Sequence, residues 1–210
     1  MSKIQTNTIQ HTANGAAVYT LPQTDGSAGQ VLQTNGSGVL SWVDQPTVPA
    51  AGLTVAQTFR RKTTLATNNA TLVFEGADSW EKADDASAGS LGSIADPDSS
   101  GVFTFPSPGI YYVTFTSYFE DSGYNTNAYI QIQATIDNSS YDTVSSTHFG
   151  TTYDQSGNNY QSGFVNGLID VTSTTNVKVR FRAYSNSSVS WDASDSQNRT
   201  AATFLRLGDT

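Results

Sequence analysis

The stretch GVFTFPSPGIYYVTFTSYFE, residues 101–120, decides the fold class. Phe103 and Phe105 alternate with smaller residues, and the Pro and Gly residues of 106–109 then predict a turn. From residue 110 onward, apolar side chains recur at every second position, which is the period of a β-strand with one face turned to a core. The predicted inward face holds Tyr111, Val113, Phe115 and Phe119, and the other face holds Tyr112, Thr114, Thr116 and Tyr118.

The same period of two returns along most of the chain after residue 53. It is clearest at 130–136 and 177–183. Further strands are predicted at 53–60, 71–75, 164–171 and 201–207. Turns rich in Asn, Ser, Gly and Asp separate these segments, and no twelve-residue stretch has a convincing helical period. The pattern predicts an all-β protein, an antiparallel sandwich of about eight to ten strands.

The composition also fits strands and turns. Among 210 residues there are 26 serines, 28 threonines and 17 glycines, and only 13% of residues are charged. The net charge of -8 argues against a nucleic-acid partner and against binding to an anionic membrane surface, because both need a basic face. No window of about 18 apolar residues could insert in a membrane, and the first residues predict no secretory signal. Because cysteine is absent, stability must come from packing, oligomerisation or both.

Residues 1–50 do not show the pattern of a packed domain. Glycines interrupt every potential strand, and the dipeptides Asp25-Gly26 and Asn35-Gly36 mark turns. The short apolar stretches between them cannot bury their own side chains. We therefore expect an extended N-terminal segment and linker that docks on a particle, followed by a knob at 51–210. The candidate docking residues are Val31, Leu32, Leu40 and Trp42.

Residues 101–106 with 108–115 resemble the signature strand pair of the TNF-like jelly rolls, which include the globular heads of the collagen-like complement proteins. Residues 163–171 with 176–180 resemble the penultimate hairpin of that family, and 203–207 resemble its last central strand. The resemblance implies a TNF-like jelly roll for the knob, and it implies a homotrimer.

The residues that we expect at the trimer interface come from two arguments. The last strand is apolar on both faces, with Phe204 on one and Leu205 and Leu207 on the other, and such a strand is usually buried on both sides. The resemblance adds Tyr112 and Phe164 as further candidates. Contact between copies at a trimer axis would bury the face of the last strand that holds Leu205 and Leu207.

A second resemblance concerns the N-terminal segment. Residues 19–22, 25–32 and 35–42 resemble a segment common in bacteriophage fibre and other virion proteins, cyanophage ones especially. It implies a virion location, with other virion proteins as partners. We therefore expect a non-enzymatic structural protein, a homotrimeric fibre or knob displayed on a phage particle, with contact to the host surface as an added role.

Two alternatives stay open. One is a capsid decoration or head-fibre protein with no receptor role. The other is a glycan depolymerase, which would need a pair of carboxylates in a cleft, whereas glutamate occurs only at positions 75, 81 and 120. His11 and His148 lie in different halves, so we predict no catalytic residue, no metal and no cofactor. The aspartates at 84, 85, 96 and 98 could hold a hard cation, although solvated turns are the commoner outcome.

Host contact, if the knob makes it, is expected from loops, because the strands are committed to packing. The candidate loops are 123–127, 151–160 and 185–198, all rich in Tyr, Asn, Ser and Asp. Neutral polar groups beside aromatic rings suit a neutral host surface glycan. Within these loops the candidate contact residues are Tyr153, Tyr160 and Trp191.

Overall fold

The computed structural model describes residues 6–10, 18–45, 53–121, 127–150 and 159–210. The chain divides into two compact units, Met1–Ala51 and Gly52–Thr210. Its regular structure is nearly all β, as the sequence predicts, and a short 3-10 helix η1 (Ala77–Ser79) is the exception in the described ranges. No helix among those residues is long and apolar enough to cross a membrane.

The first unit consists of two small hairpins. Strand β1 (Thr8–Gln10) pairs with β2 (Val18–Thr20), and β3 (Gln30–Thr34) pairs with β4 (Leu40–Asp44). The hairpins meet at a parallel bridge between Thr20 and Val39. The predicted Asn-Gly turn lies between β3 and β4, where the Asn35 side chain accepts the Ser37 amide at 2.8 Å.

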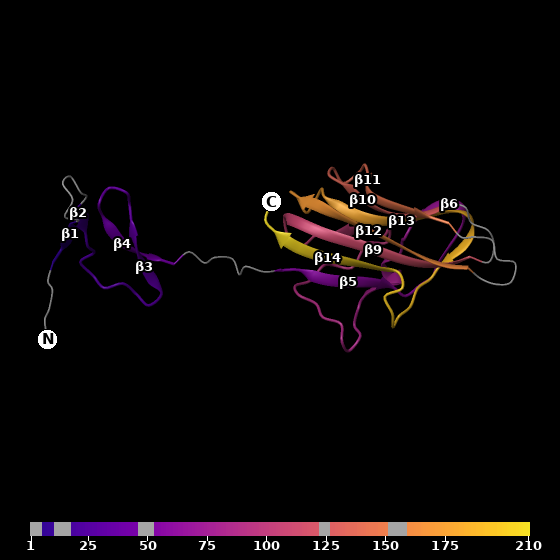
Figure 1. The fold of residues 1–210 in the computed structure, drawn as a ribbon, viewed down its shortest axis with the longest axis horizontal. Helices are drawn as coiled ribbons and strands as arrows, with labels where there is room; N and C mark the ends of the chain where they lie inside the picture. Colours follow the sequence, from indigo (N-terminus) through magenta and orange to yellow (C-terminus); the bar gives the residue numbers. More distant parts are fainter. Residues whose placement is uncertain (1–5, 11–17, 46–52, 122–126, 151–158) are drawn as a thin grey trace. The chain divides into compact units, whose positions relative to one another are not determined.

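The second unit, which we call the knob, contains the remaining strands. They are β5 (Ala56–Arg61), β6 (Leu65–Val73), β7 (Trp80–Lys82), β8 (Phe103–Thr104), β9 (Gly109–Asp121), β10 (Ala128–Thr135), β11 (Asp142–Phe149), β12 (Asn159–Val171), β13 (Lys178–Trp191) and β14 (Ala201–Gly208) (Figure 1). All their pairings are antiparallel, and together they form the predicted jelly-roll sandwich.

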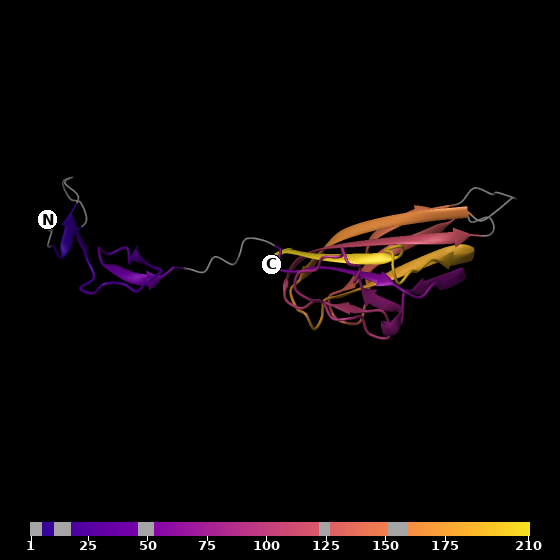
Figure 2. The same cartoon turned by 90° about the horizontal axis from the view of Figure 1, so that it is seen from below.

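The knob has two layers. One contains β12, β9, β14, β5 and β7, and the other contains β11 and β10 with β13, on which β6 and β8 pair. Figure 2 shows the layers from the side, with β12, β9 and β14 in the upper one. Strand β13 joins the layers, because its residues 178–185 pair with β10 and its residues 189–191 pair with β9.

The core lies between the layers and is rich in aromatic rings. Phe115 of β9 stacks on Phe181 of β13 with 4.5 Å between ring centroids, so the two layers meet through these rings. The alternation predicted for residues 110–120 is confirmed. Buried and half-buried residues alternate along the whole of β9, and the four predicted inward residues are all fully buried.

Three details differ from the sequence-based prediction. Residues 185–191 were expected in a loop, but they belong to β13, which continues past a bulge between Ser185 and Ser188. Trp191 was expected in a contact loop and instead ends β13, where it is 1% exposed. Ile136 was expected on the inward face of its strand, but β10 ends one residue earlier and Ile136 is 80% exposed.

Candidate functional site

The outward face of β12, β9 and β14 carries large apolar side chains. The strand register places Leu168, Tyr112 and Leu205 directly opposite one another, one on each strand. Leu168 is 62% exposed, while Tyr112 and Leu205 are half-buried. Phe164 and Leu207 lie on the same face, 55% and 50% exposed. The four residues expected at a trimer interface are thus brought together on one face, and Leu168 is an addition that the sequence reasoning missed.

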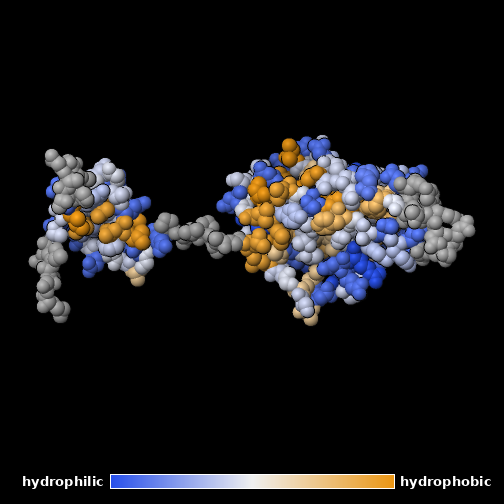
Figure 3. All heavy atoms as spheres, viewed as in Figure 1, coloured by the Kyte–Doolittle hydropathy of each residue, from blue (hydrophilic) through white to orange (hydrophobic). Residues whose placement is uncertain are grey.

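Few charges interrupt this apolar face. The next row across the strands contains Asn166, Thr114 and Thr203, and the Thr203 hydroxyl hydrogen-bonds the Thr58 hydroxyl at 2.9 Å. Figure 3 views this face and shows hydrophobic surface gathered toward the end where β14 terminates. Monomeric proteins rarely expose a large contiguous apolar patch, so this face is a candidate interaction surface.

Tyr160 and Trp191, two of the candidate host-contact residues, have different environments. Tyr160 is 53% exposed on β12, and its ring stacks on Tyr118 of β9 with 5.7 Å between centroids. Trp191 is buried against Phe119, and its indole N–H donates to the Thr67 hydroxyl at 2.8 Å. Trp191 therefore cannot contact a receptor, and that prediction is wrong. Tyr153 lies outside the described residues.

The four candidate docking residues lie in the hairpin of β3 and β4. Val31 and Leu32 are 41% and 44% exposed, whereas Leu40 and Trp42 are half-buried. The Trp42 indole N–H donates to the Thr24 carbonyl oxygen at 2.8 Å, so part of this side chain stabilises its own unit. Val31 and Leu32 are the members of the set that are most available to a partner.

The acidic turns are engaged by neighbouring protein groups. Asp84 and Asp85 pair with the buried guanidinium of Arg60, at 2.5 and 2.6 Å. Asp98 accepts the backbone amides of Ser100 and Val102 at 2.9 and 3.0 Å. No group of three or more His, Cys, Asp or Glu residues suited to a metal ion occurs in the described part of the chain. His11 lies outside that part, and the His148 imidazole lies beside Tyr129, 4.9 Å between ring centroids.

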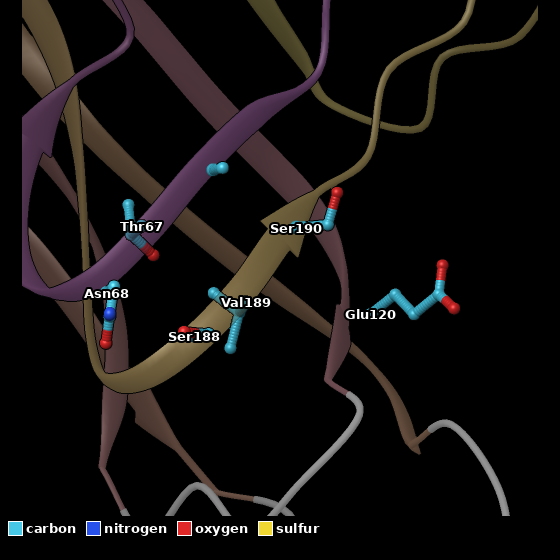
Figure 4. Close-up of a pocket in the computed structure, with 7 residues that line it drawn as sticks. Thr67, Asn68, Glu120, Ser188, Val189 and Ser190 are labelled. Carbon is cyan, nitrogen blue, oxygen red and sulfur yellow. The ribbon is translucent and has the colours of Figure 1, made fainter.

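Two hollows mark the far end of β9. The first, about 450 Å³, lies where β6, β13 and β9 adjoin and is lined by Ala66, Thr67, Asn68, Glu120, Ser188, Val189 and Ser190 (Figure 4). The second, about 390 Å³, is lined by Thr116, Tyr118, Ser162, Asn198 and Arg199. Sequence reasoning missed both, because they depend on the register between strands far apart in the chain. Partial burial raises the pKa of Tyr118 above its ordinary value, and the neighbouring Tyr160 phenol adds to this effect.

Comparison with known proteins supports the fold. No protein-family model matches the sequence, and no curated protein does. Among solved structures, Eiger TNF from S. frugiperda is similar over 74% of this chain and 94% of that chain, with a TM-score of 0.55 and 14% identity. Murine APRIL covers 73% of this chain and 98% of its own, with a TM-score of 0.49 and 11% identity. The likeness to Eiger shows a TNF-like jelly-roll fold.

Proposed function

We propose that this protein, whose knob has a TNF-like fold, is a non-enzymatic structural protein of a virion. Its knob assembles as a homotrimer, and its N-terminal unit attaches the assembly to a phage particle. The observation that carries the proposal is the apolar outward face of β12, β9 and β14, where Leu168 is 62% and Phe164 is 55% exposed.

Another copy of the same chain is the partner that best fits this apolar face. Fully burying a leucine side chain contributes about 1.5–3 kcal/mol, so several such residues on one face favour an obligate contact of about 2,000 Å² or more. A closed ring of copies buries the same patch in every subunit. The resemblance of the sequence to TNF-like jelly rolls supports three copies in that ring.

Attachment to a particle is supported by the first unit. Residues 19–42 contain the segment that resembles phage fibre proteins, and they include the exposed Val31 and Leu32 of β3. A unit of two small hairpins has little interior in which to bury such side chains. A partner surface on the virion would cover them.

The two hollows at the far end of β9 suit a structural role better than a hydrolytic one. A further hollow beside β7 is lined by Asp78, Glu81, Asp84 and Asp96 among others, but Glu81 and Asp84 are paired with Arg60. A glycan depolymerase places two carboxyl groups across its cleft. In the hollow at β6, β13 and β9, Glu120 is the one carboxylate among the lining residues. The second candidate function is a decoration or head-fibre protein that displays the same trimer with no receptor role. The exposed, stacked Tyr160 favours a knob that contacts the host surface.

Light scattering on the full chain tests the assembly. We expect the mass of three chains at micromolar concentration. Leu168→Asp should shift the mass to one chain, because a charge would then be buried in the contact. Ile136→Asp is the matched control, since Ile136 is 80% exposed and lies outside the apolar face. It should leave the trimer intact.

A stable monomer of the unaltered protein would contradict the assembly, and dissociation by Ile136→Asp as readily as by Leu168→Asp would contradict its location. The particle role is tested separately, with a gold-labelled antibody against the knob viewed on purified virions by electron microscopy. Unlabelled virions would refute it.

A further inference from the structure

A row of side chains crosses four strands near the end of β9. The register pairs Tyr160 of β12 with Glu120 of β9, Glu120 with Ser190 of β13, and Ser190 with Ala66 of β6. Paired residues of neighbouring strands project to the same face. Glu120 lies between the buried Phe119 and the buried Asp121, so this row faces outward.

Both hollows border this part of β9. Glu120 lines one, together with Ser190, Ser188 and Asn68, and Figure 4 shows Glu120 and Ser190 extending from neighbouring strands. Tyr118 lines the other. Residues two apart on a strand lie about 7 Å from each other and on the same face. The hollows therefore adjoin, with the stacked rings of Tyr118 and Tyr160 beside them.

The chemistry of this surface fits a sugar. A carboxylate accepts hydrogen bonds from two hydroxyl groups, an amide both donates and accepts, and serine hydroxyls do the same. Tyr160 adds an exposed aromatic ring, with an apolar face and a polar tip. We propose that Tyr160, Glu120, Ser190, Ser188 and Asn68 form a binding site for a neutral hexose oligosaccharide. This proposal rests on the proposed function, since a displayed knob would meet such a glycan on the host.

The charges select a neutral sugar over an acidic one. Glu120 contributes a negative charge to the first hollow. The positive charge beside the second hollow, on Arg199, is already paired with Asp192 at 2.5 Å. The protein as a whole carries a net charge of -8. A uronic acid or a sulfated sugar would therefore be repelled.

The site lies at the end of the knob opposite the one where the chain enters it. Strand β5 begins at Ala56, which pairs with Leu205, and Leu205 pairs with Tyr112. Glu120 lies eight residues farther along β9 than Tyr112, about 26 Å away at ~3.3 Å per residue. The row of Leu168, Tyr112 and Leu205 is thus distant from Glu120. Phe164, which we also assign to self-association, lies four residues from Tyr160 on β12, so the contact between copies must end between these two residues for the sugar site to stay available.

The full chain is tested on an array of neutral hexose oligosaccharides and of uronic-acid oligosaccharides. We expect binding to neutral members only. Calorimetry with the strongest neutral oligosaccharide then compares three variants. Tyr160→Ala and Glu120→Gln should each weaken binding about tenfold, the loss typical of one stacked or charge-assisted contact. Tyr184→Ala is the matched control, because it removes one ring of the stacked Tyr129–Tyr184 pair on the other sheet, and it should bind like the unaltered protein.

Each other outcome overturns the site. These outcomes are no binding to the neutral members, a preference for acidic members, and equal affinity for the Tyr160→Ala and Tyr184→Ala proteins. Light scattering on the same samples separates this result from the proposed assembly. A trimer that binds no oligosaccharide refutes the site alone, whereas a monomer that binds one refutes the trimer and keeps the site.

Discussion

Arg60 is a deeply buried charge in the knob, with 1% of its side chain exposed. Its guanidinium contacts Glu81 at 2.8 Å, Asp85 at 2.6 Å and Asp84 at 2.5 Å. Burial alone would lower the pKa of Arg60, but the hydrogen bond with Glu81 and the negative charges of the three carboxylates raise it above its ordinary value. The charge therefore stays in place and ties β5 to β7 and to the turn that follows.

Removing this charge should destabilise the knob. We expect Arg60→Met to lower the free energy of unfolding in urea by about 2–3 kcal/mol, less than for a fully buried pair because Asp84 is 77% exposed. Arg199→Met, which breaks the more exposed pair with Asp192, should lower the free energy of unfolding clearly less than Arg60→Met does. Equal losses for the two variants would show that Arg60 contributes no more than a surface ion pair.

Single residues were predictable from the sequence where the alternation was strong. The outward position of Leu205 and Leu207 follows from the fully buried Phe204 beside them. The pairing of Asp84 and Asp85 with Arg60 was not predictable, since 24 residues separate Arg60 from Asp84. Trp191 was misplaced because its neighbours are serines and aspartates.

At the scale of strands, the sequence predicted which residues lie on each face of β9, but it predicted only the first part of β13 as a strand. Its second half, Ser188-Val189-Ser190-Trp191, keeps a period of two, with Val189 and Trp191 buried. The two halves are joined by Ser185-Asn186-Ser187-Ser188 at the bulge, four small polar residues that show no apolar alternation. A strand that changes layers at a bulge therefore looks in sequence like a strand followed by a loop.

Glycine in β12 lets the edge strand of the opposite layer pack closely. A Cβ atom at Gly163 would overlap the ring of Phe149, which stacks on Phe119 at 5.2 Å and so cannot easily move. Gly163→Ala would reduce the freedom of the unfolded chain, which by itself stabilises by about 0.4–1 kcal/mol. Overpacking costs about 1–3 kcal/mol, and we expect this cost to exceed the gain from the unfolded chain. We expect a net loss in the free energy of unfolding in urea.

The control for this variant is another glycine. A Cβ atom at Gly89 would meet nothing within 4 Å, so Gly89→Ala should be neutral or slightly stabilising. If Gly163→Ala were as stable as Gly89→Ala, the close approach of Phe149 to β12 would not constrain the fold.

At the scale of the whole molecule, the sequence predicted the class of fold but not the surfaces that would use it. The jelly roll follows from period-two segments and from a resemblance carried by a few strands. The hollow beside Glu120 is formed by β6, β9 and β13. Even the nearest two lining residues from different strands, Asn68 and Glu120, are far apart in the chain. The register between strands that are so far apart in the chain is a property of the folded sheet, so no local sequence pattern predicts it.

The division into two units leads to the last prediction. Every buried core residue of the knob lies at or beyond Val55, and its strands pair among themselves. A chain lacking residues 1–50 should therefore unfold in urea at the same midpoint as the knob of the full chain, and it should keep the mass of a trimer in light scattering. It should be missing from purified virions, because the exposed Val31 and Leu32 that we assign to docking are removed. Normal incorporation of the shortened chain, measured by immunoblot of the virions, would refute the docking role and leave the fold of the knob unaffected.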